Sequence, residues 1–162
     1  MTKVAIITEA LESTPIDVER ILYPLFANEN HQESAPETDL FKEILDLMLL
    51  RERHFNTCLS HIGYQDLPNP AVTQAPQDSE VSSRKSLRAM AHSLKINREQ
   101  TIIRLRALTM KEWQSKVNHE TRGQITVRLL AQELVEHDIA RCNQLVQMMG
   151  AWRDNQRLPY DR

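Results

Sequence analysis

The segment ELVEHDIARCNQL, residues 133–145, places His137 and Arg141 four positions apart within an otherwise apolar stripe. Apolar residues around this pair recur at intervals of three and four, which is typical of an amphipathic α-helix. Residues four apart point to the same side of a helix, so both polar side chains interrupt the face that is expected to be buried. A metal or catalytic site would explain the interruption, and so would a hydrogen-bonded polar layer in a helical core.

The same periodicity extends through most of the chain and predicts an all-α fold. The expected helices run over about 38–62, 79–108 and 126–150, with a shorter one that begins near residue 14. Gly63, Gly123 and Gly150 fall at the edges of these segments, where a helix end or a turn is expected. Thr109 and Glu112 predict a capping box ahead of a short helical turn. The whole pattern predicts an up-down four-helix bundle in which the last helix begins at a Thr126 cap.

The expected domain organisation is a single domain over 1–162 with a core over 37–150. Residues 1–36 are expected to form an extension with a short extra helix, because Thr14 resembles an N-cap and Pro15 suits the first helical position. Residues 151–162 are expected to form a tail. The segment 64–78 holds three prolines and is expected to form a long crossover loop, either a surface connection between antiparallel helices or a lid over a binding site.

Composition excludes several classes of protein. A formal charge of −2 and a pI near 6.3 give no electrostatic signal for nucleic-acid binding. The two cysteines, Cys58 and Cys142, are too few for a disulfide framework and suit a reducing compartment. No apolar stretch is long enough to span a membrane, and the N-terminal residues lack the pattern of a secretory signal. We therefore expect a cytoplasmic protein without membrane or nucleic-acid partners.

Five residues form the candidate pocket, and they come from two of the expected helices: Glu52, His54, His137, Asp138 and Arg141. If the two helices are antiparallel neighbours, these side chains share one polar layer. A buried ion pair between Glu52 and Arg141, with His137 nearby, would satisfy that layer without any activity. A metal site needs at least three converging ligands, and an arginine offers no lone pair.

The C-terminal half of the chain carries motifs of a known family. They are a helix that ends in LRALT, Trp113 four residues later, a His-Glu-x-x-Gly turn over 119–123, and a last helix with LLAQELVEHD and NQL. The segment ILDLMLLRERHF, residues 44–55, resembles the family's second helix. Over residues 37–150 the chain is thus similar to the DinB-like (YfiT-like) superfamily, whose fold is a four-helix bundle.

The resemblance implies a metal centre, but most of the residues that would bind the metal are absent from this chain. Members of the superfamily often bind nickel, zinc or another divalent ion through three histidines, one on the second helix and two on the last. By position, the two last-helix ligands fall on His137 and Arg141, and the second-helix ligand falls on Leu47, with Asp46 beside it. One histidine of three remains, so the resemblance supports the fold and disfavours a cofactor. It also implies a homodimer.

Three hypotheses about function remain open at this point. The first is a metal-free, non-catalytic bundle that binds a small ligand or serves as a stress-related accessory protein; Arg141 would supply a positive charge, balanced by Glu52, Asp138 or a bound anion. The second is a hydrolase or thiol transferase that depends on nickel, zinc or manganese, held by His137 with Asp46, His54 or Asp138 as replacement ligands. The third is a protein-interaction module. The sequence alone leaves open whether the chain is an enzyme.

Overall fold

The computed structural model describes residues 3–32, 36–60, 62, 86–119 and 122–156 of the chain. The described part is mostly helical, with one small sheet, which confirms the all-α prediction. The elements are α1 (Lys3–Gln32), α2 (Pro36–Ser60), α4 (Leu87–Ala107), α5 (Met110–Trp113), β1 (Lys116–His119), β2 (Gly123–Thr126) and α6 (Val127–Gln156).

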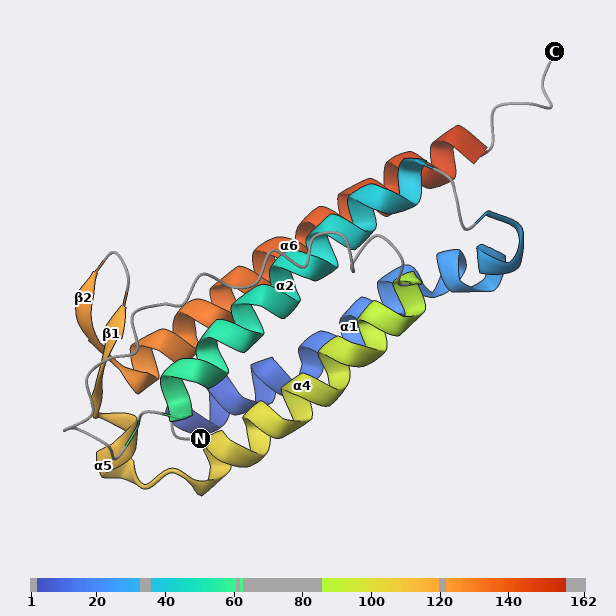
Figure 1. The fold of residues 1–162 in the computed structure, drawn as a ribbon. Helices are drawn as coiled ribbons and strands as arrows, with labels where there is room; N and C mark the ends of the chain where they lie inside the picture. Colours follow the sequence, from blue (N-terminus) through green and yellow to red (C-terminus); the bar gives the residue numbers. More distant parts are fainter. Residues whose placement is uncertain (1–2, 33–35, 61, 63–85, 120–121, 157–162) are drawn as a thin grey trace, which may run out of the picture.

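The four long helices form an elongated bundle (Figure 1). Helix α1 packs against α4 and α6, and α2 packs against the same two helices from the other side. Consecutive helices α1 and α2 therefore lie diagonally across the bundle. This arrangement brings all four helices to one central axis, so a side chain from each can reach the same level.

Helices α2 and α4 run parallel to each other, as α1 and α6 do (Figure 1). Glu52 contacts Arg98, and one turn further along both helices Asn56 contacts Thr101. The expectation that the second and third helices are antiparallel was wrong. Residues 61–86 connect α2 to α4, and a chain of that length can span a whole helix, so parallel neighbours are sterically possible.

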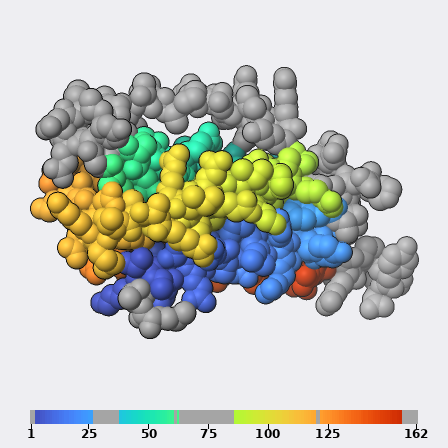
Figure 2. All heavy atoms as spheres, turned by 90° about the horizontal axis from the view of Figure 1, so that it is seen from below, coloured from blue at the N-terminus to red at the C-terminus, as the bar shows by residue number. Residues whose placement is uncertain are grey.

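Two apolar clusters fill the bundle, one toward each end. Val18, Leu22, Leu45, Met48 and Leu145 belong to the first cluster, around the N-terminal halves of α2 and α4. The second cluster lies around the C-terminal halves of α2 and α4 and is built from Leu11, Phe55, Leu105, Trp113 and Leu134, among others. Each fully buried side chain of this kind contributes about 1.5–3 kcal/mol, so these clusters supply most of the driving force for folding. Figure 2 shows α1 and α4 packed along one face of the molecule.

Helix α1 is one of the four bundle helices, which corrects the predicted short extra helix. It continues through Thr14, Pro15 and Pro24 without interruption. Thr14 is not an N-cap: its hydroxyl lies within hydrogen-bond distance of the Ala10 carbonyl, 3.3 Å away, as a residue inside a helix does. The apolar residues Leu11, Val18 and Leu22 are all buried, and their packing outweighs the local preference of proline for a helix start.

The other boundaries are a mixture of confirmed and corrected predictions. The capping box of Thr109 and Glu112 is present, and the Thr126 hydroxyl accepts a hydrogen bond from the Leu129 amide at 3.2 Å. Helix α6 does not end at Gly150 but continues to Gln156. The expected ends at Gly63 and in the 64–78 crossover lie outside the described residues.

A short hairpin precedes α6 and was missed in the sequence. Strands β1 and β2 pair antiparallel, with Val117 opposite Ile125, and Gly123 has φ of +71°, which favours glycine. Ile125 is buried in the second cluster. Glu133 of α6 pairs with Arg122 and lies 3.4 Å from His119 Nε2, so the hairpin is attached to the first turns of α6.

Candidate functional site

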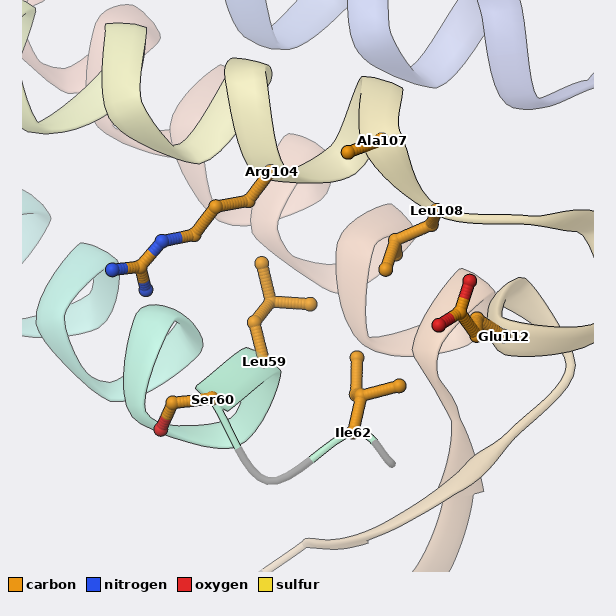
Figure 3. Close-up of a pocket in the computed structure, with 7 residues that line it drawn as sticks. All are labelled: Leu59, Ser60, Ile62, Arg104, Ala107, Leu108 and Glu112. Atoms are coloured by element: carbon orange, nitrogen blue, oxygen red, sulfur yellow. The ribbon is translucent and has the colours of Figure 1, made fainter. Parts of the chain in front are cut away.

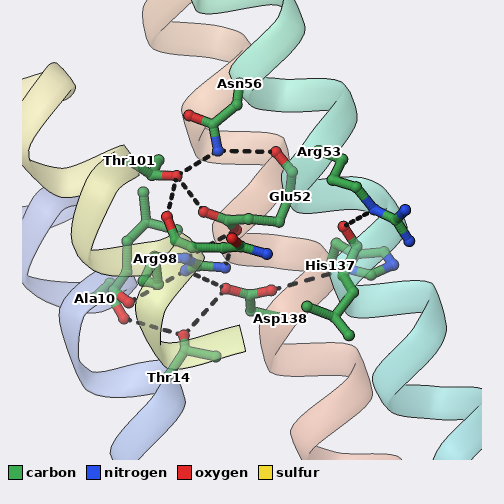
Figure 4. Close-up of polar contacts among 12 residues, drawn as sticks. Ala10, Thr14, Glu52, Arg53, Asn56, Arg98, Thr101, His137 and Asp138 are labelled. Carbon is green, nitrogen blue, oxygen red and sulfur yellow. Dashed lines mark hydrogen bonds and ion pairs between the residues drawn. The ribbon is translucent and has the colours of Figure 1, made fainter. Parts of the chain in front are cut away.

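A layer of charged and polar side chains crosses the bundle between the two apolar clusters (Figure 4). It receives at least one side chain from every long helix: Thr14 from α1, Glu52 from α2, Arg98 and Thr101 from α4, and Asp138 from α6. Glu52 is fully buried, and Arg98 and Asp138 are 1% and 2% exposed. Charges this deep persist only when they are paired and hydrogen-bonded.

Arg98 is the centre of this layer. Its Nε lies 2.9 Å and its Nη2 lies 2.6 Å from Glu52 Oε2, and its Nη1 lies 2.7 Å from Asp138 Oδ2. Burial by itself would lower the pKa of Arg98, but the charges of Glu52 and Asp138 and its hydrogen bonds to them raise it above the ordinary value. The guanidinium therefore stays protonated and joins two carboxylates from different helices.

A proline inside α1 completes the coordination of Arg98. In a regular helix the amide of residue 15 would donate to the carbonyl of Leu11, but Pro15 has no N–H. The Leu11 carbonyl instead accepts a hydrogen bond from Arg98 Nη1 at 3.2 Å. Pro15 itself is buried within α1. The proline thus frees a backbone acceptor at the level where the buried cation needs one.

On one side the layer continues from Glu52 toward the surface between α2 and α4. Thr101 donates its hydroxyl proton to Glu52 Oε1. Asn56 Nδ2 donates to Thr101 Oγ1 at 2.7 Å, and Arg104 Nη1 donates to Asn56 Oδ1 at 3.4 Å. The second carboxylate oxygen of Glu52 is therefore satisfied by neutral groups, and the chain of hydrogen bonds ends at an exposed arginine.

On the other side the layer continues from Asp138. Burial alone would raise the pKa of Asp138, but the neighbouring His137, the charge and hydrogen bond of Arg98, and the Thr14 hydroxyl hold it below the ordinary value. Thr14 Oγ1 lies 3.1 Å from Asp138 Oδ2. The other oxygen, Oδ1, lies 3.9 Å from His137 Nδ1. Asp138 is therefore a permanent anion at neutral pH.

His137 and Arg141 form an outer pair on α6. Arg141 Nε donates to His137 Nε2 at 3.4 Å, and Arg141 Nη1 donates to Gln144 Oε1 at 2.9 Å. Because Nε2 of His137 accepts, a neutral imidazole carries its proton on Nδ1, the atom that faces Asp138. Both side chains of the outer pair are half-buried. The outer pair is thus adjacent to the buried layer, but no hydrogen bond joins His137 Nδ1 to Asp138 Oδ1.

The structure separates the residues that the sequence grouped together. Glu52 and Asp138 are in the layer, but the partner of Glu52 is Arg98, so the predicted ion pair between Glu52 and Arg141 is wrong. His54 lies outside the layer, with Nε2 3.7 Å from the Sγ of Cys58. Asn56, which contacts α4, lies two positions from His54, about 160° around the helix. His54 is therefore on the flank of α2 that faces away from α4.

Arg98 was missed because its stripe looked purely apolar. It lies four residues after Leu94 and three before Thr101, so its spacing places it on the buried face. An arginine there is rare without a partner, and the partners are far away in the sequence. Two signals were available: the spacing of Arg98 and the proline at position 15.

No three of the described His, Cys, Asp and Glu side chains are arranged so that they could hold a metal ion. Among the proposed ligands, Asp138 is occupied by Arg98 and Thr14, and Leu47, at the position of the family's second-helix ligand, is 42% exposed. The two remaining groups near Arg141 are an imidazole and an amide. Arg141 itself is protonated and offers only N–H donors, so the position beside it suits an anion better than a divalent cation.

A separate groove lies at the end of the bundle where α2 and α4 finish (Figure 3). It has a volume of about 280 Å³ and apolar walls from Leu59, Ile62 and Leu108. Arg104 and Glu112 lie at its opposite sides, as Figure 3 shows. The pKa of Glu112 is lowered by hydrogen bonds from the Thr109 side chain and backbone. The groove therefore carries charges of both signs.

No protein-family model matches the chain, and searches of curated proteins and of solved structures found no significant match. Among the described helices, none combines the length and the apolar character needed to cross a lipid bilayer.

Proposed function

We propose that this chain is a metal-free, non-catalytic bundle of the DinB-like type that binds a small anionic ligand at Arg141. One observation carries the proposal. The guanidinium of Arg141 is half-buried and hydrogen-bonded to two neutral acceptors, His137 Nε2 and Gln144 Oε1. No carboxylate in the described part of the chain pairs with it. A positioned cation without a counter-ion is a common basis for anion recognition.

The ion pairs of the buried Arg98 explain why Arg141 is available to a ligand. Glu52 and Asp138, the carboxylates that Arg141 was expected to neutralise, are both bound to Arg98. Arg141 is therefore not needed inside the bundle. Its two hydrogen bonds use two of the five guanidinium N–H donors. The remaining donors can bind a carboxylate or phosphate in a bidentate manner.

The surroundings of Arg141 favour a small ligand. Burial and the charges of Asp138 and of Asp17 on α1 raise the pKa of Cys142 to about 11, so Cys142 lies on the flank of α6 that faces α1. His137 lies five positions before Cys142, about 140° around the helix, so the outer pair is on the flank toward α2. A ligand beside this flank would therefore meet the unused N–H donors of Arg141 next to the imidazole of His137.

The buried layer contains two carboxylates and one arginine, so it has one excess negative charge. The affinity of Arg141 for a monoanion is therefore expected to be modest. It is also expected to fall with ionic strength, since a half-exposed charge is screened by salt. A dianion such as phosphate or a dicarboxylate is expected to bind more tightly than acetate.

The test is ligand-induced thermal stabilisation with phosphate, sulfate, citrate, acetate and benzoate, each compared with chloride at equal ionic strength. At ten times Kd a ligand stabilises the fold by about 1.4 kcal/mol, which raises Tm by roughly 3–6 °C in a domain of this size. Arg141→Ala should abolish the shift and Arg141→Lys should retain part of it. Arg128→Ala, an exposed arginine on the same helix, is the matched control.

Absence of a shift for every anion, or an equal shift in Arg141→Ala, would refute the proposal. Metal content of untagged protein after exposure to nickel, zinc and manganese tests the alternative function. A stoichiometric ion that is lost in His137→Ala would replace the present proposal by a metal-dependent hydrolase or thiol transferase.

A further inference from the structure

The groove at the end of the bundle lies where α2, α4 and α5 meet, and the local backbone sets its shape. Helix α4 ends at Ala107, the backbone of Leu108 is extended, and Thr109 caps the short helix α5. The side chains of Leu108 and of Leu59, in the last turn of α2, line the groove. Both leucines also pack in the second apolar cluster, so the apolar walls of the groove are held in place by the core.

Glu112 supplies a positioned negative charge at one side of the groove. Its Oε2 atom accepts hydrogen bonds from the Thr109 amide and from the Thr109 hydroxyl, both at 2.7 Å. These bonds lower the pKa of Glu112, so the carboxylate is ionised at neutral pH. Within the described part of the chain both bonds go to Oε2, which leaves Oε1 for a ligand. Figure 3 shows the carboxylate directed toward Leu108.

Arg104 supplies a positive charge at the opposite side of the groove. Its guanidinium lies on the far side of Leu59 from Glu112 (Figure 3). Arg104 Nη1 donates to Asn56 Oδ1, a neutral acceptor, at 3.4 Å. No carboxylate in the described part of the chain forms an ion pair with this guanidinium. An arginine has several N–H donors, so Arg104 retains donors that can bind the carboxylate of a ligand.

The order of these groups across the groove specifies a kind of ligand. A carboxylate, two leucine side chains and a guanidinium follow one another in Figure 3. A complementary molecule has an ammonium group at one end, a carboxylate at the other and an aliphatic chain between them. An α-amino acid carries both charges on one carbon, so it cannot reach both charged side chains across the leucines. An apolar cavity of about 150 Å³ accepts benzene, so a groove of about 280 Å³ has room for an aliphatic chain of several carbons.

We propose that this groove binds a linear ω-amino acid, with its ammonium group at Glu112, its carboxylate at Arg104 and its methylene chain against Leu59 and Leu108. Each ion pair is at the surface and adds little affinity by itself, so selectivity comes from the requirement for both charged ends. The groove borders the second apolar cluster, whereas Arg141 lies beyond the polar layer. The proposal is therefore independent of ligand binding at Arg141.

An NMR titration of the full nitrogen-15-labelled chain at pH 7 and constant ionic strength tests the groove. The probes are the linear ω-amino acids from 4-aminobutanoate to 8-aminooctanoate. We expect saturable shifts at the amides of residues 108–113 and a lowest Kd at one chain length. The alkylamine and the alkanoate of that length each lack one charged end, so each should bind at least about fivefold more weakly.

Conservative variants assign each end of the ligand to its side chain. Glu112→Gln removes the negative charge and keeps the capping box, because glutamine also serves at this position. Glu112→Gln and Arg104→Gln should each raise the Kd of the best ω-amino acid about fivefold, whereas Arg104→Lys should retain most of the affinity. Arg106→Gln is the matched control, since Arg106 pairs with Glu12 of α1, and it should leave the Kd unchanged. Arg141→Ala should also leave it unchanged.

Absence of shifts at residues 108–113 for every chain length would overturn the proposal. So would an alkylamine or an alkanoate that binds as tightly as the ω-amino acid, or an unchanged Kd in either Glu112→Gln or Arg104→Gln. An anion bound at Arg141 would instead shift the amides of α6 around residue 141. Failure of this proposal is therefore distinguishable from failure of the proposed function.

Discussion

Asp138 and Arg141 are three residues apart on α6, yet Asp138 belongs to the buried layer and Arg141 to the half-buried outer pair. Asp138 is 2% exposed and held by Arg98 and Thr14, whereas Arg141 is half-buried and held by neutral groups. The two positions differ by about 60° around the helix. That rotation decides whether a charge is part of the core or is available to a ligand.

The comparison also shows that burial and function need not coincide. The most buried charges are paired with one another inside the layer, so they can specify how the helices pair but are not accessible to a ligand. The outer pair has fewer contacts and more unused donors. Substitutions in the two regions should therefore differ sharply in their effect on stability.

The largest effect is expected for Arg98→Ala. This substitution leaves Glu52 and Asp138 buried and unpaired, so the free energy of unfolding should fall by about 3–5 kcal/mol. Urea unfolding followed by circular dichroism measures the change, with Arg106→Ala as a control, since Arg106 pairs with Glu12 at the exposed surface. A loss below 1 kcal/mol would show that the layer is open to water in solution.

A smaller effect is expected from acid. Because the pKa of Asp138 is lower in the folded state than its ordinary value, the unfolded chain binds more protons between these two values. The stability from Asp138 is therefore present above its ordinary pKa, near 4, and is lost as the pH falls through the folded-state pKa. Asp138→Asn should flatten this part of the profile of unfolding free energy against pH.

At neutral pH the same Asp138→Asn substitution should lower stability by about 1.5–3 kcal/mol, since it weakens hydrogen bonds to a charged group. Glu136→Gln, an exposed residue on the same helix, is the matched control for both measurements. An acid profile that is unchanged in Asp138→Asn would contradict the assignment of this carboxylate as the titrating group.

The smallest effect on stability is expected for Arg141→Ala. Its contacts are partly exposed and link neutral partners, and such substitutions usually change the free energy of unfolding by no more than about 0.5 kcal/mol. The same denaturation series that includes Arg98→Ala provides this measurement. If Arg141→Ala lowered the free energy of unfolding as much as Arg98→Ala, Arg141 would belong to the buried layer, and the contrast between the layer and the outer pair would not hold.

Local patterns in the sequence were sufficient for several features. The periodicity of apolar residues predicted three of the four long helices, and the residue types at 109 and 112 predicted the capping box. Polar interruptions of the faces expected to be buried were identified at four positions, Glu52, His54, His137 and Arg141, with Asp138 beside the last two. Such features depend on neighbours within one or two turns, so they can be inferred without the tertiary fold.

Other features depend on which helices meet. Pro15 resembles a helix start, and only the packing of α1 against α4 and α6 makes it an interior residue whose missing N–H leaves the Leu11 carbonyl for Arg98. The parallel course of α2 and α4 sets Glu52 beside Arg98. A local pattern contains no information on the partner of a charge 46 residues away.

The sequence by itself determined that this protein is built from amphipathic helices with polar groups on their inner faces. It could do so because the spacing of apolar residues shows which face of each helix is buried and which is exposed to water. The tertiary structure decided which charges neutralise one another. A buried ion pair is stable only when its partners converge from separate helices, and the order and direction of those helices are set by the packing of the whole bundle. Because Glu52 and Asp138 converge on Arg98, Arg98 is buried in the core and Arg141 is partly exposed.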